Sequence, residues 1–183
     1  MDIGRTILRG VVGPLMIGHG TQKLFGWFGG HGVEGTGGFF ESLGLRPGKR
    51  HASAAGAAET LGGALVTLGA LTPLASTLVS SVMITAIRKV HADKGPWVSC
   101  GGYEYNLVMI AAVTALADDG PGRPSVDAEV APWLRGRGWA IASLAAAAAG
   151  SWLATDRFNE PEPQLERQPR FEREPAEAPA PAS

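Results

Sequence analysis

Five segments of low charge divide the sequence, and the one at Ala52–Leu71 constrains the fold most. It holds twenty residues with a single charge, Glu59. A helix that crosses a bilayer needs about 20 mostly apolar residues, so this segment is long enough to do so. The other four segments are Thr6–Phe28, Pro73–His91, Gly101–Ala117 and Gly138–Ala154. A soluble domain of this size should show polar faces at helical spacing throughout, which these segments mostly lack, so we predict membrane insertion.

The segments predict an all-α, polytopic membrane protein. Residues 1–127 are expected to form a four-helix transmembrane bundle, and residues 128–155 to add a fifth, C-terminal apolar helix. Its core, Gly138–Ala154, is seventeen residues without a charge, flanked by Trp139 and Trp152. At about 1.5 Å per residue it is slightly short of a bilayer core, which leaves an interfacial helix as the alternative. Residues 156–183 are charged and proline-rich, and we expect a disordered tail.

The breaks between the segments are rich in glycine and proline. Phe28–Arg50 carries two Gly-Gly pairs and an Arg-Pro-Gly sequence, and we expect a loop there. Asp118–Arg137 is predicted to be a second long, turn-rich loop. The connection at Thr72–Pro73 is very short, so the helices on either side of it should be antiparallel neighbours.

Composition excludes several classes of function. The formal net charge of −1 argues against a nucleic-acid-binding protein. Cys100 is the only cysteine, so no CxxC motif and no intramolecular disulfide can form. No HxxxH or ExxH spacing is present, and we predict no metal site. No nucleophile elbow, Walker loop or dinucleotide fingerprint is present. The sequence also has no cofactor-ligating set, so we predict no covalently attached cofactor.

Each of the first four segments has a helical face that carries ionisable residues. On a helical wheel, the first segment aligns Arg9, Gly13, Met16, Gly20, Lys23 and Trp27. The second places Glu59 among Ala52, Ala55, Gly56, Gly62, Gly63 and Val66, and small residues of this kind let membrane helices approach closely. The third aligns Thr77, Ser81, Ile84, Arg88 and His91, and the fourth aligns Glu104 with Leu107, Val108, Ala111 and Ala115. We predict that these four faces point into the bundle.

Ionisable groups inside a membrane are costly and need a partner or a function. Lys23 is placed to pair with Glu59, and Arg88 with Glu104. One interpretation is that these pairs only hold the bundle together, or that Lys23 and Arg88 extend their charges to the membrane surface. A second is a polar pocket for a small molecule or a proton, and a third is that some of these charges lie outside the membrane. The candidate ligand-binding residues of that pocket are Lys23, Glu59, Glu104, His19, Arg88 and His91.

Several motifs, taken in order, resemble the DoxX family. They are His19 to Phe25 at the end of the first segment, Gly35 to Leu45 in the following loop, and Glu59 to Gly63 in the second segment. Gly101 to Leu107 opens the fourth segment, and Gly120 to Asp127 follows it. Each motif is weak alone, but the ordered set is fairly specific and covers roughly residues 5–127. The fifth segment and the charged tail depart from the simple family plan.

The resemblance implies a small, multi-pass protein of the bacterial inner membrane. The family is named after its similarity to a quinone-linked thiosulfate oxidoreductase subunit. Some actinobacterial members are described as joining a superoxide dismutase and a sulfurtransferase at the membrane. We therefore expect a membrane redox subunit whose bundle binds quinone or a sulfur compound. The alternatives are a non-enzymatic scaffold for soluble redox proteins and a small transporter or assembly factor.

Overall fold

The computed structural model describes residues 2–160, and every regular element in that range is helical. The α-helices are α1 (Ile3–Phe25), α2 (Gly32–Ser42), α3 (Gly48–Leu68), α4 (Thr72–Ala86), α5 (Glu104–Asp119), α6 (Val126–Val130) and α7 (Arg137–Trp152). Two π-helical turns, Ile87–His91 and Leu153–Arg157, extend α4 and α7. The predicted all-α fold is confirmed for this part of the chain.

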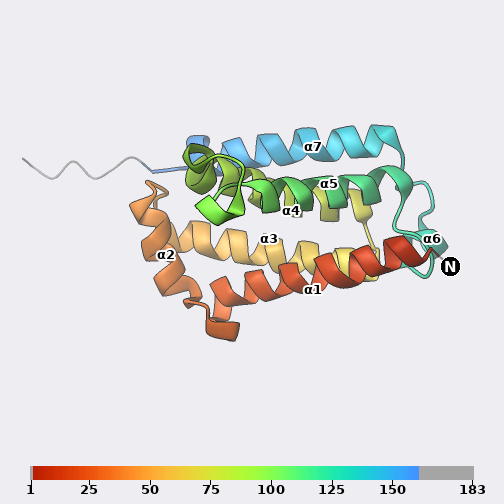
Figure 1. Ribbon diagram of the computed structural model, residues 1–183, viewed down its shortest axis with the longest axis horizontal. Helices are drawn as coiled ribbons and strands as arrows, with labels where there is room; N and C mark the ends of the chain where they lie inside the picture. The colour runs from red at the N-terminus through yellow and green to blue at the C-terminus, as the bar shows by residue number, and fades with distance from the viewer. Residues whose placement is uncertain (1, 161–183) are drawn as a thin grey trace, which may run out of the picture.

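The five long helices lie side by side with their axes roughly aligned (Figure 1). α1 packs mainly against α3, while α4 packs against α3, α5 and α7. The short α2 crosses one end of the bundle and contacts the start of α3, and α6 lies at the opposite end, near the N-terminus (Figure 1). The bundle therefore has two distinct ends, and these hold different sets of polar residues.

Each predicted apolar segment overlaps most of one long helix, and α3 and α4 are antiparallel neighbours across the short turn at Thr72, as predicted. Two loop predictions were wrong in part. The Phe28–Arg50 stretch contains α2, whose Thr36 and Gly37 are buried against the start of α3. The Asp118–Arg137 stretch contains the single turn α6. Most of the predicted tail, residues 161–183, lies outside the described residues.

Glycines allow the backbones of α1 and α3 to touch. A Cβ atom added to Gly20 would lie 2.6 Å from the carbonyl oxygen of Gly56, and one added to Gly63 would lie 2.6 Å from that of Gly13. Carbon atoms essentially never approach an oxygen so closely, so neither position has room for a larger residue. The two contacts are seven residues apart on each helix, which is two helical turns. They form a continuous seam of the kind that small residues give membrane helices.

Arg9 ties three segments together at the α6 end. Its guanidinium is buried and donates to the carbonyl oxygens of Val66 at 3.2 Å and Thr67 at 2.9 Å, in the last turn of α3. It also donates to Pro121 at 3.0 Å and Pro124 at 2.7 Å. The last carbonyl groups of a helix lack partners within it and carry partial negative charge. Arg9 supplies hydrogen bonds and a positive charge to these carbonyl groups, and it also anchors the loop that follows α5.

Asp127 stabilises the start of α4 in a complementary way. Its carboxylate accepts from the backbone N–H groups of Leu71 and Thr72, both at 2.8 Å, and from the Thr72 hydroxyl at 2.6 Å. The first N–H groups of a helix have no partners within it, and a carboxylate there is favoured by the helix dipole. Leu71 has a left-handed φ of 44°, which is strained for a residue with a side chain, and the carboxylate holds it there.

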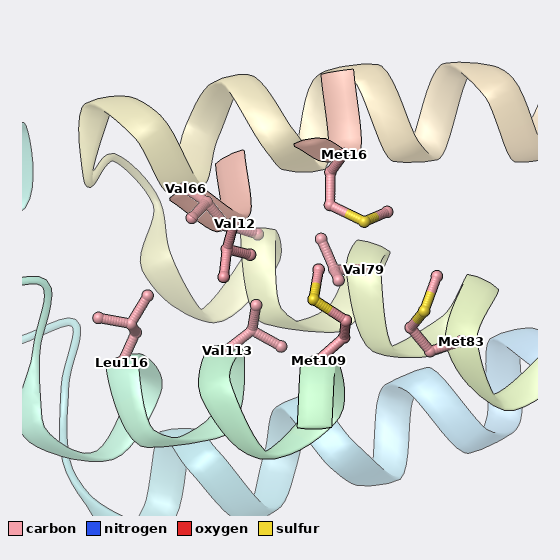
Figure 2. Close-up of a cluster of buried hydrophobic side chains, with 9 residues drawn as sticks. Val12, Met16, Val66, Val79, Met83, Met109, Val113 and Leu116 are labelled. Carbon is pink, nitrogen blue, oxygen red and sulfur yellow. The ribbon is translucent and has the colours of Figure 1, made fainter. Parts of the chain in front are cut away.

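The interior of the bundle is lined by medium-sized and small side chains. Figure 2 shows Val12 and Met16 of α1 facing Val79 of α4 and Met109 and Val113 of α5. Ser76 and Ser80 of α4 are also fully buried. Many large apolar side chains instead point outward, including Ile3, Ile7, Val11 and Leu15 at one-turn spacing along α1. Large apolar side chains therefore cover the outside of the bundle as well as filling its core.

Two of the four predicted inward faces are correct. Arg9, Gly13, Met16 and Gly20 of α1 are buried, as are Glu59 and its small neighbours in α3. Trp27 is exposed, however, and the faces predicted for the third and fourth segments were wrong. α4 buries Ala75, Ser76, Val79, Ser80 and Met83, and α5 buries Asn106, Met109, Val113, Leu116 and Ala117. Both helices are apolar on several sides, so hydrophobicity alone does not identify the packed face.

One helix among residues 2–160 combines the length and apolar character needed to cross a membrane. It covers Arg137–Arg157, which is α7 with its π-helical end. α4 reaches a comparable length only with its π-helical turn, which carries Arg88, Lys89 and His91, and α5 has 16 residues, fewer than the roughly 17 that a span requires. α1 and α3 are longer but carry ionisable residues within their length.

The glycine seam predicts opposite effects for two nearby substitutions in α1. Gly20→Ala should lower the free energy of unfolding by about 1–3 kcal/mol, because the added methyl group meets the α3 backbone. Gly18→Ala meets nothing within 4 Å and should be neutral or stabilising by about 0.5–1 kcal/mol, as expected for a helix interior. Thermal unfolding in detergent compares them, and equal stability of the two variants would contradict the seam.

The Asp127 contacts predict a second loss of stability. Asp127→Ala removes three hydrogen bonds from the α3–α4 turn and should cost about 0.5–2 kcal/mol, the usual range for a helix cap. Asp118→Ala is the control, because Asp118 is exposed near the end of α5. The same unfolding measurement applies, and an unchanged midpoint for Asp127→Ala would show that the cap is unimportant.

Candidate functional site

A pocket of about 380 Å³ lies between α2, α3, α4 and the end of α7, at the α2 end of the bundle. Most of its wall is apolar. Phe39, Phe40, Leu43 and Leu45 come from α2 and the turn after it, Ala54, Ala55 and Ala58 from α3, and Val82, Met83, Ala86 and Val90 from α4 and its extension. Pockets that bind small molecules are typically apolar with a few placed polar groups.

The Lys23–Glu59 ion pair forms part of the pocket wall. The ammonium Nζ of Lys23 lies 2.6 Å from Oε2 and 2.9 Å from Oε1 of Glu59, as the sequence predicted. The Glu59 side chain is 3% exposed and that of Lys23 is 23% exposed. Lys23 is the third residue after Gly20, and Glu59 is the third after Gly56, so the glycine contact brings the two charges together. A carboxylate buried to this degree needs such a partner.

Three further titratable side chains line the pocket: His51 of α3, and Lys89 and His91 of the π-helical turn. Nδ1 of His91 lies 2.6 Å from the carbonyl oxygen of Gly101, and Nε2 of His51 lies 3.3 Å from that of Arg46. In each ring, a nitrogen that donates to a carbonyl leaves the other free for a ligand. The pocket thus combines an apolar body with several hydrogen-bonding groups.

The predicted Arg88–Glu104 pair is absent. Arg88 instead donates to Asp156 at 2.8 Å and to the hydroxyls of Ser151 and Thr155 at 3.1 Å. Glu104 accepts from the backbone N–H of Val98 at 2.9 Å, in the loop before its own helix. The prediction failed because α7 packs beside α4 and supplies a closer carboxylate. Glu104 meanwhile stands in the first turn of α5, where a carboxylate holds the preceding loop.

His19 also lies outside this pocket. Its Nδ1 is 3.2 Å from Oε1 of Gln22, and its ring meets that of Tyr105 edge-on. It lines a separate, more open depression beside Phe28. Of the six predicted residues, Lys23, Glu59 and His91 line the main pocket, and His19, Arg88 and Glu104 do not. A ligand-binding role for any of them stays a prediction.

Sequence reasoning missed His51 and Lys89. His51 lies eight residues before Glu59, a spacing that returns to the same face of a helix, but it falls just before the apolar segment. Lys89 was overlooked beside Arg88. Lys89 lies three residues after Ala86, so ordinary helical spacing places it on the pocket side of α4. The face predicted for this segment contained Arg88 and left that side out.

The segment after α7 closes one side of the pocket. Ala154 and Thr155 line it directly. The chain then crosses the turn between α2 and α3, where the Asn159 side chain accepts from the N–H of Arg46 at 2.6 Å and donates to the carbonyl oxygen of Gly44 at 2.8 Å. The Arg88–Asp156 pair fixes the same segment to α4. The C-terminal segment is therefore a structural wall of the site.

A polar pocket of about 240 Å³ lies at the opposite end, beside α6. Its wall includes Asp2, Arg5 and Arg123. The Asp2 carboxylate accepts from the N–H of Arg123 at 2.8 Å and from Arg5 at 2.7 Å. These hydrogen bonds, that of Arg123 first, lower the pKa of Asp2 below its usual value. The groups in this pocket mainly bind one another and the backbone, which suggests a structural clamp. Among residues 2–160, no group of three or more His, Cys, Asp or Glu is arranged to hold a metal ion.

Comparison with known proteins identifies the family. The DoxX family model matches residues 4–92. The chain is 32% identical over 115 residues to the "Putative oxidoreductase CatD" of Bacillus subtilis (strain 168), covering 63% of this chain and 79% of that protein. The chain belongs to the DoxX family. No solved structure matches it significantly.

The DoxX match and the pocket coincide. Every lining residue except Ala154 and Thr155 lies within residues 4–92. The DoxX region therefore supplies almost the whole site, and α7 adds the last wall from outside that region. DoxX membership and the similarity to a protein named as an oxidoreductase are consistent with a membrane-associated, redox-linked protein.

The buried ion pair predicts that Glu59 is far less replaceable than an exposed glutamate. Glu59→Leu leaves the Lys23 charge unpaired beside apolar walls, and should cost up to the roughly 3–5 kcal/mol seen when buried pairs are broken. Glu34→Leu breaks only the exposed Lys49–Glu34 pair, worth about 0–1 kcal/mol. The yield of folded protein and its unfolding midpoint compare the two. Equal tolerance of both changes would rule out a structural need for the buried pair.

Proposed function

We propose that this DoxX protein is a multi-pass protein of the bacterial inner membrane and serves as a membrane subunit of a redox system. In this proposal the pocket beside Lys23 and Glu59 binds a quinone. The observation that carries it is the combination of a largely apolar, ring-sized pocket with a buried ion pair in its wall.

The distribution of side chains supports the membrane part of the proposal. Lipid tails are as apolar as leucine, so membrane helices associate through small and polar residues and turn large apolar ones outward. The Gly13–Gly63 and Gly20–Gly56 contacts, the buried serines of α4 and the outward row from Ile3 to Leu15 follow this rule. α3 has 21 residues and is roughly 31 Å long, close to the thickness of a bilayer core.

The pocket offers contacts both for the apolar ring of a quinone and for its two oxygen atoms. Phe39, Phe40 and Met83 offer apolar surface to a ring, while Lys23 and the histidines offer donors to its oxygens. Quinone reduction to quinol takes up two electrons and two protons. Glu59 is placed to hold a proton at the pocket wall and Lys23 to balance its charge. Oxidation of two thiols to a disulfide would supply both electrons and protons, which fits a thiol-linked partner.

The second candidate is a scaffold without chemistry of its own. Phe25, Trp27 and Phe28 form an exposed aromatic group at the pocket end of α1. Such a group suits the docking of a soluble redox protein, and the family resemblance suggests superoxide dismutase or a sulfurtransferase. It also suits the aromatic belt of a membrane surface. The two candidates differ in whether the pocket holds a ligand.

Purification in mild detergent, followed by solvent extraction and mass spectrometry, tests the quinone proposal. The wild-type protein should retain up to about one quinone per chain, because the ligand is enclosed on several sides. Ala58→Phe fills the pocket and should reduce retention by about tenfold or more. Ala57→Phe is the matched control, since Ala57 is exposed next to the site without lining it. Absence of quinone from the wild type, with a soluble protein co-purifying in fixed ratio, would favour the scaffold instead.

A further inference from the structure

The charges that line the pocket do not balance. Lys23 and Glu59 neutralise one another at 2.6 Å. Lys89 also lines the pocket, and it makes no hydrogen bond or ion pair with any of the described residues. The carboxylate that its charge influences at longer range, Asp156, is already bound to Arg88 at 2.8 Å. One positive charge is therefore left facing the pocket.

The apolar surroundings of the Lys89 ammonium make it unfavourable for this charge to lack a counter-ion. Lys89 is half-buried, and the pocket wall that it shares includes the apolar Val82, Ala86 and Val90. An ammonium group in such surroundings loses part of its hydration without gaining a counter-ion, which is unfavourable. An anionic group entering the pocket would restore that interaction, and the low local dielectric would strengthen it. A neutral ligand of the same shape would leave the ammonium unpaired.

The other charged and polar groups of the pocket do not oppose an anion. Among the described residues, Glu59 is the only carboxylate in the wall, and both of its oxygens contact Lys23. His51 and His91 can each present a ring nitrogen that donates when protonated. Placing Lys89 and His91 on the same π-helical turn brings both to one side of the pocket.

We propose that the pocket takes its aromatic ligand in an anionic form, with an ionised ring oxygen against the Lys89 ammonium. The ligand class is a quinone or phenol with an acidic ring hydroxyl. This inference rests on the proposed function, because it concerns the same pocket. The new element is a preference for an anionic over a neutral ligand, and the inference assigns that preference to Lys89.

Two ring compounds of nearly equal size allow binding of an ionised ligand to be compared with binding of a neutral one. 2-Hydroxy-1,4-naphthoquinone is an anion at neutral pH, and 2-methoxy-1,4-naphthoquinone is not. Binding of each to the purified full-length protein is measured in the same detergent by tryptophan fluorescence quenching. The wild type should bind the hydroxy compound about tenfold more tightly than the methoxy compound, the ratio expected for one retained ion pair.

Variants assign the preference to Lys89. Lys89→Gln should bring the ratio of the two affinities close to one, by weakening the hydroxy compound far more than the methoxy compound. Lys89→Arg keeps the charge and should restore the preference. Lys94→Gln is the control, because Lys94 is exposed and does not line the pocket.

The outcomes separate the two proposals. Equal binding of both compounds by the wild type would overturn the anion preference and leave the quinone pocket standing. A preference that survives in Lys89→Gln would overturn the role of Lys89. Binding of neither compound would overturn both the selectivity and the quinone pocket itself.

Discussion

The close approach of α1 and α3 at Gly20 and Gly56 is the contact on which the rest of the site depends. Without side chains between them, the two helices come near enough for Lys23 and Glu59, one turn further along, to form a direct ion pair. That pair makes a buried carboxylate tolerable in an apolar wall. α2, α4 and the end of α7 then complete the pocket around it.

The polar residues at the α6 end of the bundle stabilise the fold, whereas several at the α2 end are available to a ligand. At the α6 end, Arg9 and Asp127 satisfy the last carbonyls of α3 and the first N–H groups of α4, so their charges are used within the protein. At the α2 end, Lys89 has no bonded partner among the described residues and the histidines keep a ring nitrogen free. A polar group whose partners are all internal stabilises the fold, whereas one that faces a pocket without a partner is available to a ligand.

Sequence reasoning recovered the features that depend on low-charge segments and on the helical spacing of small residues. The all-α fold and the five long helices follow from the segments, and the small face of α3 and the Lys23–Glu59 pair follow from the helical wheel. It failed for the packed faces of α4 and α5. These helices carry apolar residues on both their inner and outer sides, so the hydrophobic pattern does not distinguish the buried face from the exposed one. Arg88 was paired wrongly because its partner, Asp156, lies in a helix 68 residues later. Lys89 was missed because the face predicted for α4 contained Arg88 and left out the neighbouring side, which lines the pocket.

Photoaffinity labelling tests the central claim that this pocket is a quinone site most directly. The purified protein is irradiated with an azido-quinone, with and without excess unmodified quinone, and the labelled peptides are mapped. The account predicts that competitor-sensitive labelling falls on Phe39–Leu45 and Ser81–His91, which form facing walls of the pocket. Labelling confined to the outward row of α1 around Ile7 and Val11, and unaffected by competitor, would mean that the quinone only dissolves around the helices. That result would contradict the account.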